Sequence, residues 1–338
     1  MTPPRGLGLV PALIAGVLLV LPSGAAAPPA TISLETKPVV FSPLQPQKNR
    51  FGALEWRGGL EISAQNSHFG GFSGLVLNRD GSRMIALSDR GWWLQSELVY
   101  EGGRLAGLES AVMNQLLKPG GKPYGSKKHR DAESIISWTS GDLSDLVVSF
   151  ERRHRLVRYR APGNALTVPG RRLHALKSFK RLRYNKGLEA IARFPAASAL
   201  RGWIIAVAEG TLDKAGNHLA WLLRGRSARR LSVKKRGEFE ITDAAAMPGG
   251  DLILLERAVS LLGGPRFALR RIKAAHIRAG AVLDGEVLIE ADLRHTIDNM
   301  EGLALHRHPD GELRLTLISD DNFSLIQRTL LLQFALRE

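Results

Sequence analysis

The chain of 338 residues contains no cysteine, and this absence excludes several kinds of chemistry. Disulfides, thiolate metal sites, cysteine nucleophiles and lipid attachment at a cysteine are all ruled out. Aromatic residues are also scarce, at 6% of the chain. Without disulfides the fold must be stabilised by its core, and a chain of this length can bury one large enough.

Long apolar runs are absent beyond the N-terminus. Residues 1–27 place Arg5 before an apolar stretch, 7–21, and end in three alanines, which is the layout of a secretory signal peptide cleaved near Ala27. The alternative is an uncleaved anchor, but the stretch is short for a span of about 20 residues. We expect a periplasmic or secreted protein with no stable membrane insertion. Residues 28–48 contain five prolines and predict an extended lead-in to a single domain over 49–338.

Acidic residues are outnumbered, 32 against 47 basic ones, which gives a formal net charge of +15. A basic exterior attracts anions, although a compositional habit of the source organism explains scattered arginines equally well. The basic tracts 224–230 and 234–236 lack interleaved aromatic residues, and with export this argues against a nucleic-acid partner. The tracts fit charged turns between outer strands, which discourage edge-to-edge pairing.

Against this basic background, acidic residues recur at regular intervals. Five segments place an acid or a serine directly before a short run of small or apolar residues, at intervals of 54 to 60 residues. These anchors are Ser73, Glu133, Glu189, Asp243 and Glu301. Each unit then continues into an apolar run that ends on an acid, at Asp89, Glu151, Glu209, Glu256, and Asp320 with Asp321.

A fixed period of this length indicates a stacked or radial array of one structural unit. Each unit reads as four short strands separated by turn residues, which is typical of a β-propeller blade. We therefore predict an all-β propeller with five four-stranded blades, and six blades is the alternative. Residues 53–63 can supply the outer strand that the last unit lacks, beside residues 328–336.

In a propeller, residues at the start of each innermost strand and at the end of the next strand converge on the central channel. Ionised carboxylates cannot crowd there without protons, arginines or a cation. Oxygen ligands without cysteine or anchor histidines favour Ca²⁺ over Zn²⁺ or copper. The metal-ligand candidates are Glu133, Glu189, Asp243, Glu301 and Asp320. For each single acid, a hydrogen bond to a turn amide or an arginine of the next blade is the competing interpretation.

The repeat units also resemble a known family. The segments "GFSGL…ALSDRG", "DAES…VSFERRHRLVRY", "NKGLEAIA…AEG", "ITDAAAM…LILLER" and "DNMEGLAL…ISDDNF" resemble, in order, the phytase-like family described as "esterase-like activity of phytase". The resemblance covers roughly His68 to Phe323. It implies an exported bacterial β-propeller related in name to the calcium-dependent propeller phytases. Where that pattern has glycine, this chain has Ser134, Ala190 and Ala244, so a role that needs a positive φ is in doubt there.

The resulting hypothesis is a Ca²⁺-assisted hydrolase of a small anionic ester, phosphate or carboxylate, at an acid-lined channel mouth. Glu209 and Asp89 are the candidates for taking the proton, and the candidates for holding the anion are Arg90, Arg152, Lys186 and Arg257. A lactonase-like ester hydrolase and a non-catalytic propeller that binds a ligand or a partner remain alternatives. Serine hydrolase chemistry lacks support, because no G-x-S-x-G motif occurs.

Overall fold

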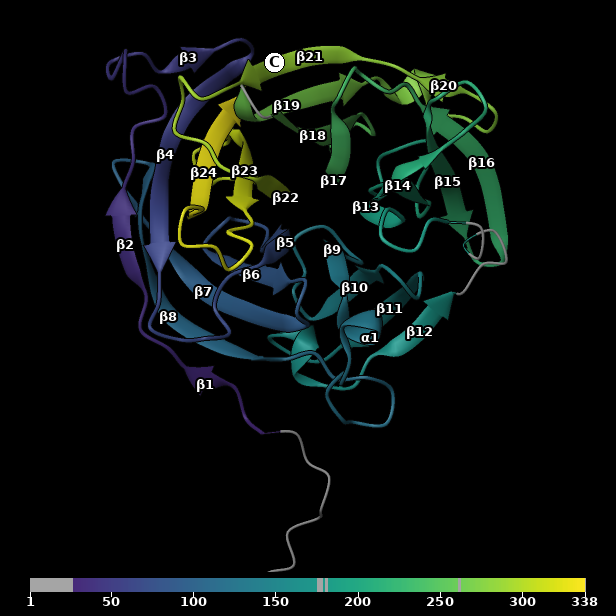
Figure 1. Ribbon diagram of the computed structural model, residues 1–338, viewed down its shortest axis with the longest axis horizontal. Coiled ribbons are helices and arrows are strands. Elements are labelled where there is room, and N and C mark those ends of the chain that lie inside the picture. Colours follow the sequence, from purple (N-terminus) through teal and green to yellow (C-terminus); the bar gives the residue numbers. More distant parts are fainter. Residues whose placement is uncertain (1–26, 175–178, 180–181, 261–262, 338) are drawn as a thin grey trace, which may run out of the picture.

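The computed structural model describes residues 27–337 apart from 175–178, 180–181 and 261–262, so the expected signal peptide lies outside the described residues. Five sheets, antiparallel except for one short parallel pair in the third, stand radially around one axis and form a β-propeller (Figure 1). The predicted five blades are confirmed. In the described part of the chain, no helix has the length and apolar character that a membrane crossing requires.

The first two blades follow the predicted pattern of short strands. Blade 1 contains, from the axis outward, β5 (Phe72–Leu77), β6 (Arg83–Ser88), β7 (Trp92–Glu101), β8 (Arg104–Gln115) and β1 (Ala30–Thr31). Blade 2 contains β9 (Ala132–Ser137), β10 (Asp145–Phe150), β11 (Arg155–Arg160) and β12 (Arg171–His174). Two short helices belong to this region, α1 (Lys127–Arg130) before β9 and the 3₁₀ turn η1 (Ala165–Thr167) after β11.

The next three blades complete the ring. Blade 3 contains β13 (Leu188–Arg193), β14 (Ile204–Leu212), β15 (His218–Arg224), β16 (Ser227–Val233) and β20 (Val282–Leu283). Blade 4 contains β17 (Glu240–Ala246), β18 (Leu252–Ser260), β19 (Gly264–Ile272) and β21 (Glu286–Ala291), with the 3₁₀ turn η3 (Ala274–His276) after β19. Blade 5 contains β22 (Met300–Arg307), β23 (Leu313–Ser319), β24 (Thr329–Leu336), β4 (Leu54–Ser63) and β2 (Glu35–Pro38), with β3 (Arg50–Phe51) beside β4.

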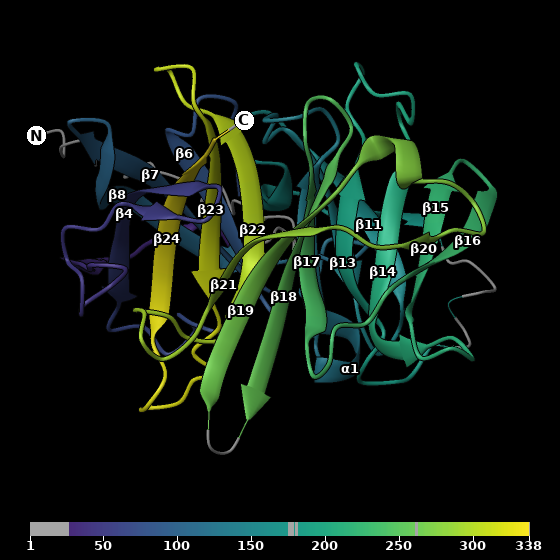
Figure 2. The ribbon, with the colours of Figure 1, turned by 90° about the horizontal axis from the view of Figure 1, so that it is seen from above.

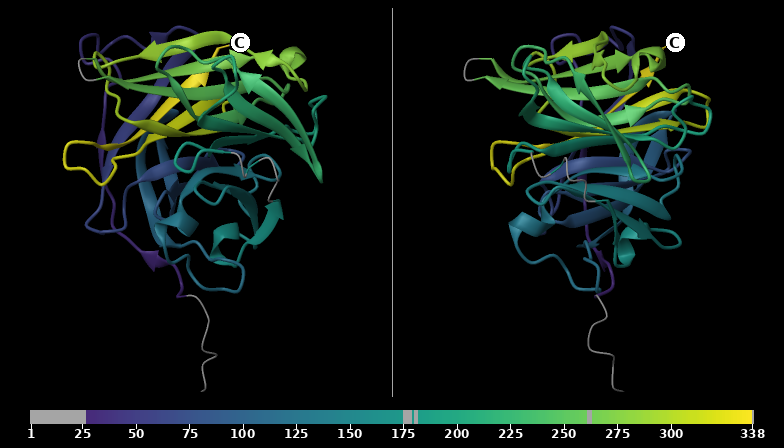
Figure 3. Two further views of the ribbon diagram at one scale, coloured as in Figure 1. Left: turned by 45° about the vertical axis from the view of Figure 1, so that its right-hand side comes forward. Right: turned by 90° about the vertical axis from the view of Figure 1, so that its right-hand side faces the viewer.

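The two ends of the propeller sequence meet in blade 5. β24 pairs antiparallel with β4, with Leu336 opposite Leu54 and Thr329 opposite Ile62. The predicted closure by residues 53–63 is therefore confirmed. The lead-in continues as extended chain on the outside of the ring, where β2 pairs with β4 and β1 with β8 (Figure 3, purple). Closure of this kind removes an open sheet edge.

The core lies between the sheets. The large clusters of buried apolar side chains in the described residues each join two neighbouring blades. One cluster, for example, contains Phe267 of blade 4 and Phe334 of blade 5. Because each sheet buries both faces, its middle strands are buried throughout, as in β10 and β23, and are mostly apolar. This packing holds the innermost strands at fixed distances around the axis.

Each innermost strand is interrupted by a β-bulge near its start. In blade 3, Leu188 pairs with Ala208 and Ala190 with Val207, so Glu189 is the extra residue. The same register shift occurs in the innermost strands of the other four blades. A bulge turns the extra side chain away from the ordinary alternation of the strand. The five bulges therefore present five equivalent side chains at one end of the axis.

Candidate active site

The end of the axis at which the innermost strands begin is called here the acid mouth, and the other end the far mouth. Figure 2 shows the blades edge-on, with α1, which directly precedes β9, at one end of the molecule. Two rows of side chains surround the acid mouth. The bulge row consists of Ser73, Glu133, Glu189, Thr242 and Glu301. The strand-end row lies on the second strand of each blade or directly after it, one residue beyond the partner of the residue that precedes the bulge, and consists of Asp89, Glu151, Glu209, Arg257 and Asp320.

Blade 4 departs from the expected anchors by one residue. Ile241 pairs with Glu256 and Asp243 with Leu255, which makes Thr242 the extra residue of the bulge. Hydrogen bonding supports the equivalence with blade 1. The Thr242 hydroxyl donates to the Met300 carbonyl of blade 5 at 3.3 Å, as the Ser73 hydroxyl donates to the carbonyl at the corresponding position of blade 2 at 2.7 Å. The prediction that Asp243 is the repeat equivalent of the other anchors is therefore wrong by one position.

Asp243 instead belongs to a ring around the channel that is formed by the residues directly after each bulge. The other members of this ring are small: Gly74, Ser134, Ala190 and Gly302. The Asp243 carboxylate accepts hydrogen bonds from the Ser134 hydroxyl and the Leu303 amide, both at 2.7 Å. Its side chain thus spans the channel from blade 4 to blades 2 and 5. Burial raises the pKa of Asp243 well above its usual value.

Glycine is needed in this ring for space rather than for backbone conformation. Neither Gly74 nor Gly302 has a positive φ. A Cβ on Gly302 would lie 3.0 Å from the Gly74 carbonyl carbon and 2.7 Å from a methyl group of Ile318. The small residues therefore let the innermost strands approach closely. Ser134, Ala190 and Ala244, which stand where the family pattern has glycine, do not have a positive φ either.

Three carboxylates of blade 2 come together at the acid mouth. Asp131, Glu133 and Glu151 are all buried, and one oxygen from each lies within 4.8 Å of the others. Glu151 also accepts the Gly187 amide at 2.7 Å, and the Glu189 carboxyl lies near it, which connects the triad to blade 3. Asp131 was missed in the sequence because an acid does not recur at its position: Gly71, Gly187 and Asn299 stand there in three of the other four units, and only Glu240 of blade 4 is acidic.

Cationic side chains neutralise only part of this charge. Lys127 lies 2.9 Å from Asp89 and 3.8 Å from Asp131, and Arg152 forms an ion pair with Asp131. Arg257, which replaces a carboxylate in the strand-end row, lies 3.3 Å from Glu209 and 3.0 Å from Glu301. In the described part of the chain, four acids of the mouth have no such partner: Glu133, Glu151, Glu189 and Asp320.

The same four acids have raised pKa values. Burial, the largest cause in every case, raises the pKa of Glu151 to about 7 and that of Asp320 to about 8. Burial and the neighbouring carboxylates raise the pKa values of Glu133 and Glu189 well above the usual range. Near neutral pH the mouth must therefore hold protons or take up a cation.

The donor set fits a hard divalent cation. Two oxygens bound to one Ca²⁺ at 2.3–2.6 Å can be no more than about 5 Å apart. The triad of Asp131, Glu133 and Glu151 meets this limit with one oxygen from each side chain. Every ligand atom in this set is a carboxylate oxygen, as Ca²⁺ prefers.

The predicted anion-holding residues divide into two groups. Arg257 and Arg152 already bind groups of the protein itself. Arg257 donates to the Asn299 side chain at 2.5 Å in addition to its two ion pairs, and Arg152 is paired with Asp131. Arg90 lies against the face of Phe323, with its Cζ 3.2 Å from the ring centroid, and Lys186 is exposed. Arg90 and Lys186 are therefore the cations at this mouth that remain available to a substrate anion.

Glu256, the acid that precedes Arg257, does not reach the mouth. It is completely buried and lies 2.5 Å from Arg270 and 3.1 Å from Arg236. Glu256 therefore has a structural role in ion pairs with arginines, which is the alternative to metal binding that the sequence left open for each acid.

Comparison with known proteins places this geometry in a family. A solved structure that is similar to the chain is the Cps50 (Swd1) β-propeller domain of Myceliophteria thermophila, at 10% identity and a TM-score of 0.41, with 88% of this chain and 99% of that chain covered. No functionally curated protein matches significantly. The family described as "Phytase-like: Esterase-like activity of phytase" matches residues 67–323, which span both rows of the acid mouth. The chain belongs to this phytase-like family.

Proposed function

We propose that the protein is an exported hydrolase that cleaves a small phosphate or carboxylate ester at the acid mouth with the help of Ca²⁺. The observation that carries the proposal is a group of four carboxylates without a cationic partner at one end of the axis: Glu133, Glu151 and Asp320 are buried, and Glu189 is half-buried. Burying ionised carboxylates costs free energy unless protons or a cation compensate their charge, and one bound cation would compensate several of them together.

Glu133 of the triad would hold the cation, with Asp131, Glu189 and Asp320 extending its oxygen ligands. Glu151, the third member of the triad, would lie next to the cation without binding it. When bound, a divalent cation polarises the ester and lowers the pKa of an adjacent water. Asp131 and Glu301 are less available than the other acids, because they are paired with Arg152 and Arg257, and Asp243 is held by hydrogen bonds from blades 2 and 5. Asp243 would therefore support the site rather than ligate directly.

Among the chain's own groups, Glu151 is the best candidate for taking a proton from the attacking water. General bases work best when their pKa lies near the working pH, and burial brings the pKa of Glu151 to about 7. Asp89 and Glu209 were predicted for this role from the sequence, but Lys127 and Arg257 respectively lie against their carboxylates. Arg90 and Lys186 would hold the anionic group of the substrate.

The experiment is turnover of three substrate classes by the purified protein, with CaCl₂ and with EDTA. We use p-nitrophenyl phosphate, p-nitrophenyl acetate and a δ-lactone, so that phosphoesterase, carboxylesterase and lactonase activities are separated. The expected result is calcium-dependent turnover of at least one class. Glu151→Gln should lower its rate by roughly 10²–10⁴-fold, as for loss of a general base.

The matched control is Glu101→Gln, which makes the same chemical change at an exposed strand end away from the mouth. Its rate should equal that of the wild type. Equal rates with CaCl₂ and EDTA, or no turnover of any class by protein that binds Ca²⁺, would contradict the proposal. The second of these results would favour a non-catalytic propeller.

A further inference from the structure

The far mouth contains a cavity with a chemistry opposite to that of the acid mouth. It has a volume of about 630 Å³ and lies where the innermost strands of the blades end. An innermost strand of six residues spans about 20 Å, so the cavity lies about that distance from the buried carboxylates. Its volume is in the usual range for a site that encloses a small organic molecule.

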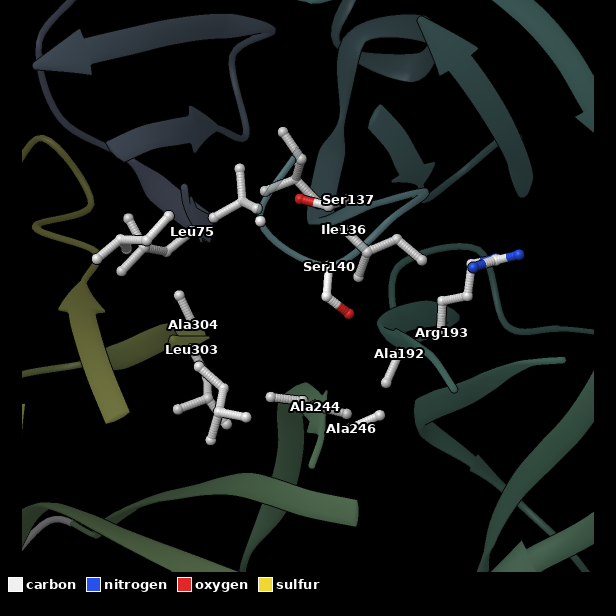
Figure 4. Close-up of a pocket in the computed structure, with 16 residues that line it drawn as sticks. Leu75, Ile136, Ser137, Ser140, Ala192, Arg193, Ala244, Ala246, Leu303 and Ala304 are labelled. Carbon is white, nitrogen blue, oxygen red and sulfur yellow. The ribbon is translucent and has the colours of Figure 1, made fainter. Parts of the chain in front are cut away.

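Apolar groups form the body of the cavity. Its walls include Pro195, Ala197, Pro248, Leu305 and Leu313. A smaller hollow of about 80 Å³ continues from it into the channel and shares Ser140, Arg193, Ala246 and Leu305 with it. Figure 4 shows this inner part, where the Ser140 hydroxyl points into a space bordered by the small side chains of Ala192, Ala244 and Ala246. The alanines leave room near the axis that larger residues would fill.

Four arginines border the same cavity: Arg79, Arg193, Arg201 and Arg307. No aspartate or glutamate is among its lining residues, and none of the four arginines forms an ion pair within the described part of the chain. Arg158, by contrast, lies beside the same tryptophan as Arg193 and is paired with Asp145 at 2.5 Å. The far mouth therefore carries positive charge that no acidic side chain of the described residues neutralises in an ion pair.

Two partly or fully buried groups in the lining also lack partners. Arg193 stacks on Trp138 and donates to its carbonyl, but its Nε is buried without an acceptor. Burial and the nearby Arg158 lower the pKa of Arg193, because both destabilise its charged form. A ligand anion beside Arg193 would stabilise the charged form. His306 is 4% exposed, and both of its ring nitrogens lack a hydrogen-bond partner among the described residues. Unsatisfied buried polar groups of this kind call for a partner.

We propose that the far mouth binds an amphipathic organic anion, a ligand with one anionic group and a compact apolar body. The apolar walls would enclose the body, and the arginines would bind the anionic group through charge-assisted hydrogen bonds. This site is separate from the acid mouth and does not depend on hydrolysis there.

The test uses a pair of fluorescent probes with one aromatic skeleton. 8-Anilinonaphthalene-1-sulfonate carries the anionic group, and N-phenyl-1-naphthylamine lacks it. Both are titrated into the folded full-length protein in EDTA, so that the acid mouth is free of metal. The expected result is a saturable single site for the sulfonate and weaker binding of the neutral probe.

The double variant Arg201→Gln/Arg307→Gln changes two exposed arginines of the rim, so the fold should be unaffected. It should bind the sulfonate roughly tenfold more weakly, as expected for lost charge-assisted hydrogen bonds, and the neutral probe equally well. The matched control, Arg226→Gln/Arg230→Gln, removes the same charge from the exposed β15–β16 hairpin and should bind both probes like the wild type. Unchanged sulfonate binding in the rim variant, or an equal loss in the control, would overturn the proposal.

Discussion

Replacing Glu151 by glutamine should make the stability of the metal-free protein less dependent on pH. Glu151 is 5% exposed, and burial raises its pKa from 4.5 to about 7. A folded state that holds a proton more tightly than the unfolded state loses stability as the pH rises from the lower pKa to the higher. The stability from this group is therefore complete below about pH 4.5 and is lost as the pH passes 7. Since one pKa unit is worth about 1.4 kcal/mol, the loss is roughly 3 kcal/mol.

Glutamine has nearly the shape of glutamate and keeps an oxygen that can accept the Gly187 amide, now 2.7 Å from Glu151. It cannot ionise, so the variant should not lose this 3 kcal/mol. The assay is urea unfolding in EDTA at pH 5, 6, 7 and 8 for the wild type, Glu151→Gln and the exposed control Glu101→Gln. As the pH rises from 5 to 8, the free energy of unfolding of Glu151→Gln should increase relative to that of the wild type. For the control, the difference from the wild type should stay the same at every pH. Parallel curves for all three proteins would refute the reasoning.

Three further changes test the geometry around the acid mouth. Arg257→Gln removes the cation that pairs with two carboxylates and should lower the free energy of unfolding in EDTA by about 3–5 kcal/mol, with part of the loss restored by Ca²⁺. Gly302→Ala places a methyl group 3.0 Å from a neighbouring backbone and should cost about 1–3 kcal/mol, whereas Gly107→Ala, with its nearest atom at 3.6 Å, should be near neutral. Asp243→Ala removes the carboxylate that accepts from the Leu303 amide and the Ser134 hydroxyl, which leaves a buried amide without a partner, so the free energy of unfolding should fall by about 1–3 kcal/mol. Equal stability of the two glycine variants, or an Arg257→Gln protein as stable as the wild type in EDTA, would contradict this geometry.

Much of the fold could be predicted from the sequence because each blade repeats the same alternation of apolar runs and turns. The five blades and the closure of β24 by β4 follow from counting those runs and finding one strand missing at the end. These local patterns predict the fold correctly because most strands pair with the strand that comes directly before or after them in the sequence.

The register at the bulges could not be predicted in the same way. A bulge shifts the pairing by one residue without changing the composition of the strand, so Asp243 looked equivalent to Glu189 although Thr242 holds that position. The partners of Glu256 were hidden for another reason. Arg236 lies in the loop before β17 and Arg270 on β19, and only the folded blade brings them to the carboxylate. Asp131 does not belong to the repeated pattern of acids. Its place in the triad depends on Glu151, which is distant from it in the sequence.

Titration of CaCl₂ into the EDTA-treated and dialysed protein at pH 7 is the most direct test of the acid mouth. The measurement is calorimetric, in two buffers that differ in ionisation enthalpy, so that proton release is counted together with binding. A bound cation must displace protons from carboxylates whose pKa values are raised, such as Glu151 and Asp320. We predict saturable binding with release of protons, and loss of both in Glu133→Gln/Glu189→Gln. No binding by the wild type, or binding that the double variant leaves unchanged, would contradict the account.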